Sequence, residues 1–193
     1  MRVVRARARG TRRNAAALRL AHPIPERRSL RTGTPAVAPV IPSVSEILRS
    51  RRPITLPVEH RPNGEVMDFN KPGWCSAYAV RAAKILFGVN YERGHAWDIG
   101  SKNKTIKATA QRLKNLEPGQ LVGVYFEWSN NNRPERPYTH IALCIGNRAG
   151  TKYIMHNIGR WGLRVEPLGN ISKSYNGKVI EIIQPIPPVK SGD

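Results

Sequence analysis

Hydrophobic and polar positions along residues 74–87 follow the period of an α-helix. Apolar side chains recur three and four residues apart, while Arg81 and Lys84 fall on the opposite side. A Pro-Gly break precedes the run, and Gly88, a residue type that commonly ends helices, follows it. The pattern therefore predicts a mostly apolar helix over residues 74–87, with Cys75 in its first turn.

Two further segments have the features of helices. Ser43 and Glu46 stand at the spacing of a capping box, which predicts a short helix that runs through Arg52 and stops at Pro53. Residues 104–116 place apolar side chains on one face and basic side chains on the other, and this pattern predicts a second amphipathic helix.

After residue 116 the pattern changes from the period of helices to that of β-strands. Short apolar or alternating runs, separated by turn residues, predict strands over residues 121–126, 139–146, 152–157, 163–166 and 178–184. Helices that come before a series of strands are typical of an α+β domain, and we expect the sheet to be antiparallel.

The net charge of +19 is unevenly spread along the 193 residues. Residues 1–62 contain 14 Arg, no Lys and three acidic residues, so they carry +11 of that charge, and they also hold half of the prolines. Such a shift in composition marks a boundary between a tail and a domain. We therefore predict a largely disordered Arg- and Pro-rich extension over 1–62, a folded domain over 63–188 and a short tail over 189–193.

The arginines of residues 2–31 leave three interpretations open. They could neutralise the phosphates of nucleic acid or another polyanion, form a plain solvated tail, or belong to an organellar transit peptide, which is Arg-rich and acid-poor. No apolar segment follows the basic start as in a secretory signal peptide, and no apolar run is long enough to span a bilayer. The sequence therefore predicts no transmembrane segment and leaves the location of the protein open.

Cysteine usage points to thiol chemistry rather than to disulfides or metal binding. Cys75 and Cys144 are too few for a disulfide framework, and no Cys or His pair has the spacing of metal ligands, so no metal or organic cofactor is predicted. Cys144 lies within an apolar run and is expected to be buried. Cys75 differs, because the free N–H groups and the dipole at the start of a helix favour a thiolate.

Two histidines follow Cys75 in strand-like runs, His140 and His156. Cysteine, then histidine, then a polar orienting residue is the order along the chain of papain-like thiol hydrolases. Four local sequences also resemble elements of the NlpC-type and CHAP cysteine peptidases and amidases: the nucleophile turn, the Gly-Asn-Ala and Trp element, the Pro-Gly-Asp turn and the histidine strand. In this chain they read Trp74–Tyr78, Gly94–Asp98 with His95 in place of Asn, Pro118–Val122 with Gln120 in place of Asp, and Thr139–Gly146.

The resemblance implies a papain-like α+β fold, in which the Cys helix packs on a small antiparallel sheet. It also implies hydrolysis of a peptide or amide bond, most often in bacterial peptidoglycan, with Cys75 as the nucleophile and His140 as the base. His156 fits the NlpC pattern for the third residue, and Asn157 fits the CHAP spacing. Neighbouring residues of a strand face opposite sides, so only one of the two can point at His140, and we favour His156.

Aromatic and imidazole side chains near these motifs are the candidates for contacting a substrate: Trp74, His95, Trp97 and Trp161. A polyanionic cell wall suits the positive charge, and the Arg-rich extension suits a phage-encoded, virion-associated protein or one released on lysis. Two other classes share the pattern. One is a non-catalytic structural or nucleic-acid-binding protein, and the other is an acyltransferase or deamidase that acts on a protein or lipid, because a fold and a nucleophile do not fix the substrate.

Overall fold

The computed structural model describes residues 40–129 and 136–188, which form an α+β domain. The helices of these residues are α1 (Val44–Ser50), α2 (Cys75–Phe87), α3 (Ile99–Lys102), α4 (Ala110–Lys114), α5 (Asn170–Lys173) and the 3-10 turn η1 (Gly159–Trp161). The strands are β1 (Glu59–His60), β2 (Val66–Met67), β3 (Thr105–Lys107), β4 (Leu121–Phe126), β5 (His140–Arg148), β6 (Thr151–Ile158), β7 (Gly162–Pro167) and β8 (Gly177–Ile183). The predictions for the Arg-rich residues 2–31 and for the tail at 189–193 lie outside the described residues.

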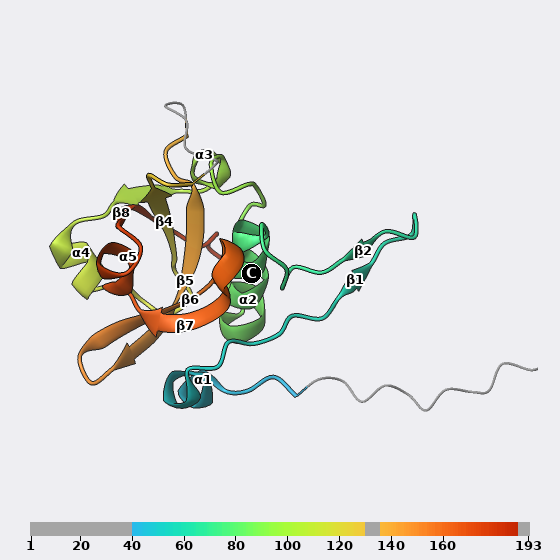
Figure 1. Ribbon diagram of the computed structural model, residues 1–193, viewed down its shortest axis with the longest axis horizontal. Helices are drawn as coiled ribbons and strands as arrows, with labels where there is room; N and C mark the ends of the chain where they lie inside the picture. The colour runs from blue at the N-terminus through green and yellow to red at the C-terminus, as the bar shows by residue number, and fades with distance from the viewer. Residues whose placement is uncertain (1–39, 130–135, 189–193) are drawn as a thin grey trace, which may run out of the picture. The chain divides into compact units, whose positions relative to one another are not determined.

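Six of the strands form one antiparallel sheet in the order β3-β8-β4-β5-β6-β7 (Figure 1). The last strand of the chain, β8, pairs with β4 and so lies inside the sheet rather than at its edge. β1 and β2 form a separate two-stranded hairpin. The five predicted strands are confirmed, with ends that agree to within two residues.

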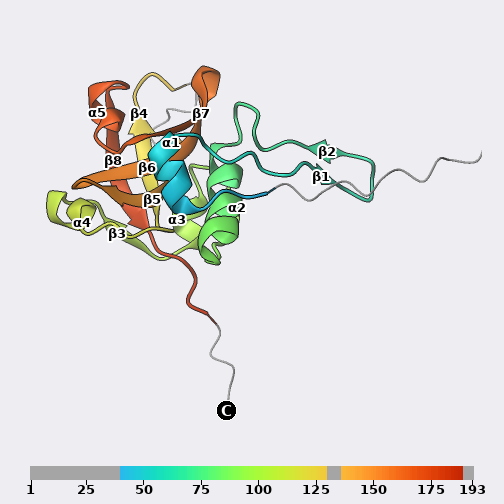
Figure 2. The same ribbon diagram turned by 90° about the horizontal axis from the view of Figure 1, so that it is seen from below.

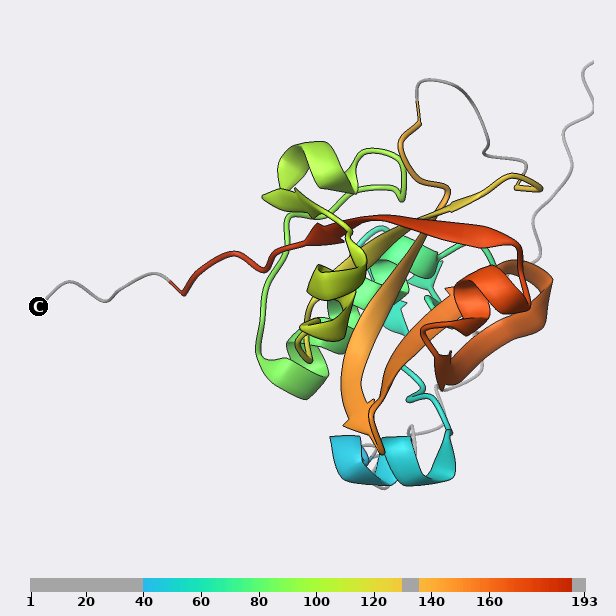
Figure 3. The same ribbon diagram turned by 90° about the vertical axis from the view of Figure 1, so that its left-hand side faces the viewer.

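Both faces of the six-stranded sheet are buried, because alternate residues of its central strands enter two different cores. The core on the side of α1 and α2 takes the sheet residues Leu121, Ile141, Leu143, Ile145, Met155 and Ile183. The core on the side of α4 and α5 takes Val122, Val124, Ala142, Cys144, Ile154 and Ile182. Figures 1 and 3 show α2 and α5 on opposite faces of the sheet. The expectation that Cys144 is buried is confirmed.

Helix α2 packs across β5 and β6 with a face made largely of small residues. Ala79, Ala82 and Ala83 are fully buried there, which lets the helix backbone lie close to the sheet. Gly88 ends the helix in the left-handed conformation at φ 70°, as predicted. α2 has 13 residues, and none of the helices in the described residues has the length and apolar character that crossing a bilayer requires.

The segment before α2 is part of the domain rather than of a disordered extension. Ser43 caps α1 through the predicted capping box, in which the Ser43 hydroxyl and the carboxylate of Glu46 each accept the other residue's backbone N–H. Ile47, Ile54 and Leu56 are then buried in the core on the α2 side, where Figure 2 shows the segment running alongside the helix. The folded part therefore starts before the predicted boundary at residue 62. The sequence pattern does not reveal this, because the apolar side chains are scattered along the segment and find their partners in the folded core.

Residues 104–116 do not form the single amphipathic helix that their pattern predicts. The first part is strand β3, which pairs with β8 and places Ile106 opposite Ile182. Thr109 then caps the short helix α4 by accepting a hydrogen bond from the backbone of Arg112. The prediction is wrong because pairing with β8 outweighs the helical periodicity of the segment, and β-branched Thr105 and Ile106 suit a strand.

Candidate active site

Cys75 is the first residue of α2, and its sulfur faces the backbone of β5. The N–H groups of Ile141, Ser76 and Cys75 itself favour the thiolate, as expected at the start of a helix. Packing around the half-buried side chain is the larger effect, however, and it raises the pKa of the thiol above its ordinary value. The resting state is therefore a thiol, and the sequence-based expectation of a stabilised thiolate is not met.

His140 begins β5 and is almost completely buried. Its Nε2 lies 3.0 Å from Nδ1 of His156, in the neighbouring strand β6. Burial and the neighbouring imidazole of His156 hold the pKa of His140 well below its ordinary value. The ring is therefore neutral at pH 7, which is the form that can accept a proton.

Glu166 in β7 continues this line of contacts. Its Oε1 lies 2.7 Å from Nε2 of the fully buried His156, while Oε2 accepts hydrogen bonds from Asn170 (2.9 Å) and the hydroxyl of Tyr175 (3.2 Å). Burial alone would raise the pKa of Glu166, but the hydrogen bonds from His156, Asn170 and Tyr175 hold it below its ordinary value. Glu166 is therefore ionised at neutral pH. We call His140, His156 and Glu166 the His-His-Glu network.

The ionised carboxylate fixes the proton that faces it in the His-His-Glu network. A carboxylate only accepts hydrogen bonds, so Nε2 of His156 carries a proton and donates a hydrogen bond to Glu166. In the tautomer with a single proton on His156, its Nδ1 accepts, so Nε2 of His140 is the donor in the contact between the rings. The remaining nitrogen of His140, Nδ1, is unprotonated in that tautomer.

Asn157 faces the other side of β6, as the alternation of the strand predicts. Its Nδ2 donates hydrogen bonds to the backbone oxygens of Phe69 (3.1 Å) and Lys71 (2.6 Å), so it holds the segment that leads into α2. Its Oδ1 is buried and has no hydrogen-bond partner among the described residues. The structure thus brings His156 rather than Asn157 into contact with His140.

Two cavities meet at Cys75. The His140 cavity, of about 110 Å³, is lined by Cys75, His140, Phe126, Trp128, Asn157 and neighbouring residues. The His95 cavity, of about 300 Å³, lies on the other side of the cysteine and is lined by Trp74, His95 and Trp97. Three of the four predicted substrate-contacting residues therefore lie in one cavity beside the thiol. A substrate that reaches across Cys75 would enter both spaces.

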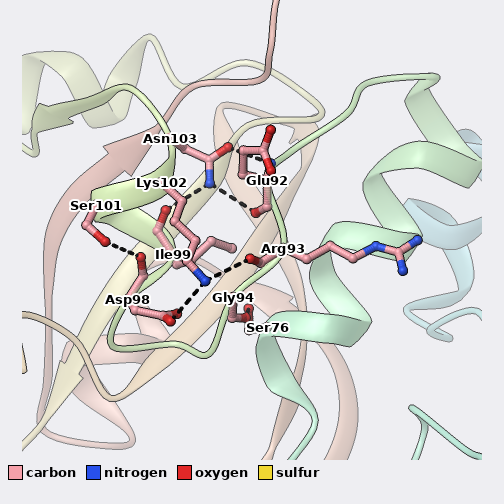
Figure 4. Close-up of polar contacts among 9 residues, drawn as sticks. All are labelled: Ser76, Glu92, Arg93, Gly94, Asp98, Ile99, Ser101, Lys102 and Asn103. Carbon is pink, nitrogen blue, oxygen red and sulfur yellow. Dashed lines mark hydrogen bonds and ion pairs between the residues drawn. The ribbon is translucent and has the colours of Figure 1, made fainter.

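The wall of the His95 cavity is held by a network of polar contacts in residues 92–103 (Figure 4). The side-chain oxygen of Asn103 accepts a hydrogen bond from the backbone N–H of Glu92, and its side-chain nitrogen donates one to the backbone oxygen of Glu92. Lys102 forms an ion pair with Asp98 at 3.2 Å. Ser76, next to Cys75 in α2, donates a 2.6 Å hydrogen bond to the backbone oxygen of Gly94 and so ties this loop to the start of α2.

His95 and Trp97 are oriented by contacts between their rings. The two rings stack with centroids 4.3 Å apart, and the guanidinium of Arg136 lies 4.2 Å from the Trp97 ring. Within the described residues, no group of three or more His, Cys, Asp or Glu side chains is arranged to hold a metal ion.

Trp161, the fourth predicted substrate-contacting residue, lies in a larger groove. We call it the Trp161 groove; it has a volume of about 930 Å³, and its aromatic lining comes from Trp128, Trp161 and Tyr175. Trp128 and Ser129 line both this groove and the His140 cavity, so the two spaces adjoin.

Sequence reasoning missed Glu166 and Tyr175. Glu166 was assigned only to a predicted edge strand, yet a signal was present, because a hairpin of β6 and β7 brings a carboxylate in β7 within reach of His156. Tyr175 follows α5, an element that the sequence pattern did not predict, and its contact with Glu166 depends on the tertiary fold.

Comparison with known proteins gave no relative from which a function could be transferred. No family model, no curated protein and no solved structure matched the chain.

Proposed function

We propose that this chain is a papain-like cysteine hydrolase that cleaves a peptide or amide bond in bacterial peptidoglycan. The observation that carries the proposal is the His-His-Glu network, whose His140 lines the same cavity as Cys75. Displaced pKa values such as those of His140 and Glu166 are concentrated at functional sites, which supports a functional role for the network.

In the proposed reaction, the thiol proton of Cys75 passes to Nδ1 of His140 while the sulfur attacks the carbonyl carbon of the scissile bond. The tetrahedral intermediate collapses when His140 returns that proton to the leaving nitrogen, and a thioester to Cys75 remains. Water then attacks the thioester, His140 takes one of its protons, and the sulfur leaves and is protonated again. The proton transfers and the attack are concerted, because both partners are neutral at rest.

His156 and Glu166 have separate tasks in this mechanism. His156 contacts Nε2 of His140 and so fixes the orientation of the ring, which leaves Nδ1 as the nitrogen that takes the thiol proton in the proposed reaction. Glu166 fixes the tautomer of His156 and stabilises the positive charge that His140 gains on taking the proton. The backbone N–H groups around the sulfur stabilise negative charge at the reacting centre.

The substrate class is supported by charge and by the shape of the site. A net charge of +19 favours binding to a polyanionic cell wall. Cavities on both sides of Cys75 suit a branched or extended chain better than a small molecule. The chain is similar to the NlpC-type and CHAP enzymes in two features. One is a helix that starts with Cys75, and the other is an antiparallel sheet in which one strand starts with His140.

Release of soluble fragments from purified peptidoglycan sacculi tests the proposal. We expect the wild-type protein to release new amino termini, and we expect the Cys75→Ala and His140→Ala variants to release none. Cys144→Ala is the matched control, because Cys144 is buried in the core on the opposite face of the sheet from α2. Release that survives in Cys75→Ala, or no release by the wild type from sacculi with direct and with bridged cross-links, would overturn the assignment.

A further inference from the structure

The Trp161 groove adjoins the proposed catalytic cavity and is far larger than it. It has a volume of about 930 Å³, against about 110 Å³ for the His140 cavity. Binding sites for small ligands have volumes of about 300–1,000 Å³, so the groove has room for several residues of a substrate. Since Trp128 and Ser129 belong to both spaces, a chain that occupies the groove can extend to Cys75.

The walls of the groove are a cluster of aromatic rings in fixed orientations. The rings of Trp128 and Trp161 meet edge to face at 5.3 Å, and those of Trp161 and Tyr175 at 5.6 Å. The indole N–H of Trp128 donates a 2.7 Å hydrogen bond to the backbone oxygen of Tyr175, which keeps the two sides of the groove together. Rigid aromatic surfaces of this kind bind ligands at little cost in side-chain entropy.

Two basic side chains give the groove a positive charge. Arg160 and Lys173 line it, and no carboxylate does among the residues that the structure describes. The guanidinium of Arg160 lies 4.7 Å from the ring of Trp161. Both side chains are exposed, and neither forms an ion pair with another described residue. They are therefore free to bind an anion that lies against the aromatic wall.

We propose that the Trp161 groove binds a carboxylate-bearing segment of the substrate chain, with Arg160 and Lys173 as its anion-binding residues. The inference rests on the proposed function, because the occupant of the groove is taken to be the same molecule that reacts at Cys75. It adds that the substrate carries acidic groups on one side of the scissile bond. Arg160 and Lys173 thereby select among peptides that all reach the thiol.

A single-stranded nucleic acid is the competing occupant, because stacked aromatic residues and cations also bind unpaired bases and phosphates. The link between the groove and the cavity of Cys75 favours the acidic peptide. Nucleic acid contains no peptide bond, whereas a groove that opens toward a nucleophilic thiol is placed to hold the molecule that the thiol attacks.

Rates of covalent labelling of Cys75 test the inference without a known substrate. The probes are the amides of iodoacetyl-Gly-Glu-Glu and iodoacetyl-Gly-Gln-Gln, which have the same length and differ in charge, with iodoacetamide as the small neutral reference. Full-length wild type is compared with Arg160→Gln, Lys173→Gln and the double variant, and the labelled cysteine is identified by peptide mass spectrometry. Lys84→Gln is the matched control, because Lys84 is an exposed cation near the other end of α2 from Cys75.

We expect the wild type to react faster with the Glu probe than with the Gln probe, and we expect each single variant to lose up to about fivefold of that preference, the upper range for an exposed ion pair. The double variant should lose the preference, while Lys84→Gln should keep it and the rate with iodoacetamide should stay unchanged throughout. The control is needed because a net charge of +19 attracts any acidic peptide.

Three outcomes would overturn the inference: equal rates for the two probes in the wild type, a preference that survives in the double variant, or protection of Cys75 from iodoacetamide by oligo(dT) at a lower concentration than by acetyl-Gly-Glu-Glu amide. Failure of the proposed function is seen separately, as an iodoacetamide rate that does not depend on His140. The preference for the Glu probe can be present or absent in either case.

Discussion

Replacing Glu166 with glutamine removes the charge that fixes His156 while keeping the shape of the side chain. A hydrogen bond to a charged group contributes about 1.5–3 kcal/mol and a neutral one about 0.5–1.5 kcal/mol, so the hold on His156 weakens by about 1–2 kcal/mol. The new amide nitrogen can also donate to Nε2 of His156. Both imidazoles would then adopt the opposite tautomer, and Nδ1 of His140 would carry a proton where the thiol needs an acceptor.

We therefore expect Glu166→Gln to slow the reaction of Cys75 by about five- to thirtyfold, since each 1.4 kcal/mol corresponds to one factor of ten. The assay is the rate of iodoacetamide labelling of Cys75 at pH 7, followed by peptide mass spectrometry, together with release of fragments from sacculi. Asn170→Ala is the matched control, because it removes another hydrogen bond to the same carboxylate and leaves the charge in place. An unchanged rate in Glu166→Gln, or an equal loss in Asn170→Ala, would refute the role of the charge.

The same substitution changes how stability depends on pH. The folded-state pKa of Glu166 lies below its ordinary value of 4.5, because hydrogen bonds to the carboxylate outweigh burial. Ionisation of Glu166 therefore stabilises the fold above pH 4.5, and this contribution is lost as the pH falls through the folded-state pKa. Between pH 6 and pH 3, the wild type should lose more unfolding free energy than Glu166→Gln in urea titrations. Parallel losses in the two proteins would contradict the assignment of an ionised Glu166.

Two other substitutions test the packing and the support of the site. In Gly123→Ala, a Cβ atom would lie 2.6 Å from a ring carbon of the buried Tyr138, so we expect a loss of about 1–3 kcal/mol in calorimetric stability, whereas unchanged stability would mean that the ring can move aside. In Asn157→Ala, the backbone oxygens of Phe69 and Lys71 lose their donor, so we expect a loss of about 1–3 kcal/mol and slower labelling of Cys75 without a shift of its pH profile. A shifted profile would show instead that Asn157 acts on His140.

The strands and α2 could be predicted because their patterns agree with their tertiary surroundings. β4 and β5 are largely apolar on both faces, and the structure buries both faces between helices, so no competing pattern exists. Residues 104–116 show the opposite case. Their helical periodicity is real, but the edge of β8 offers backbone partners to residues 105–107, and a pattern of side chains does not reveal a free sheet edge.

The candidate site could be predicted in part for a similar reason. Alternation along β6 was enough to place His156 and Asn157 on opposite faces, and the contact of His156 with His140 follows that expectation. The protonation state of Cys75 could not be predicted, because the position at the start of a helix is visible in the sequence while the packing around the sulfur is not. The role of Glu166 depends on the pairing of β6 with β7, which the order of the two predicted strands indicates but which their side-chain pattern alone does not fix.

The most direct test of the central claim is the pH dependence of Cys75 labelling by iodoacetamide in the wild type and in His140→Ala. If His140 takes the thiol proton, the wild type reacts at pH 7 and slows only well below pH 6.5, where His140 becomes protonated. The variant should then react only as the thiol ionises, above pH 9.0, because packing raises its pKa. Identical profiles in the two proteins would contradict a catalytic pair of Cys75 and His140.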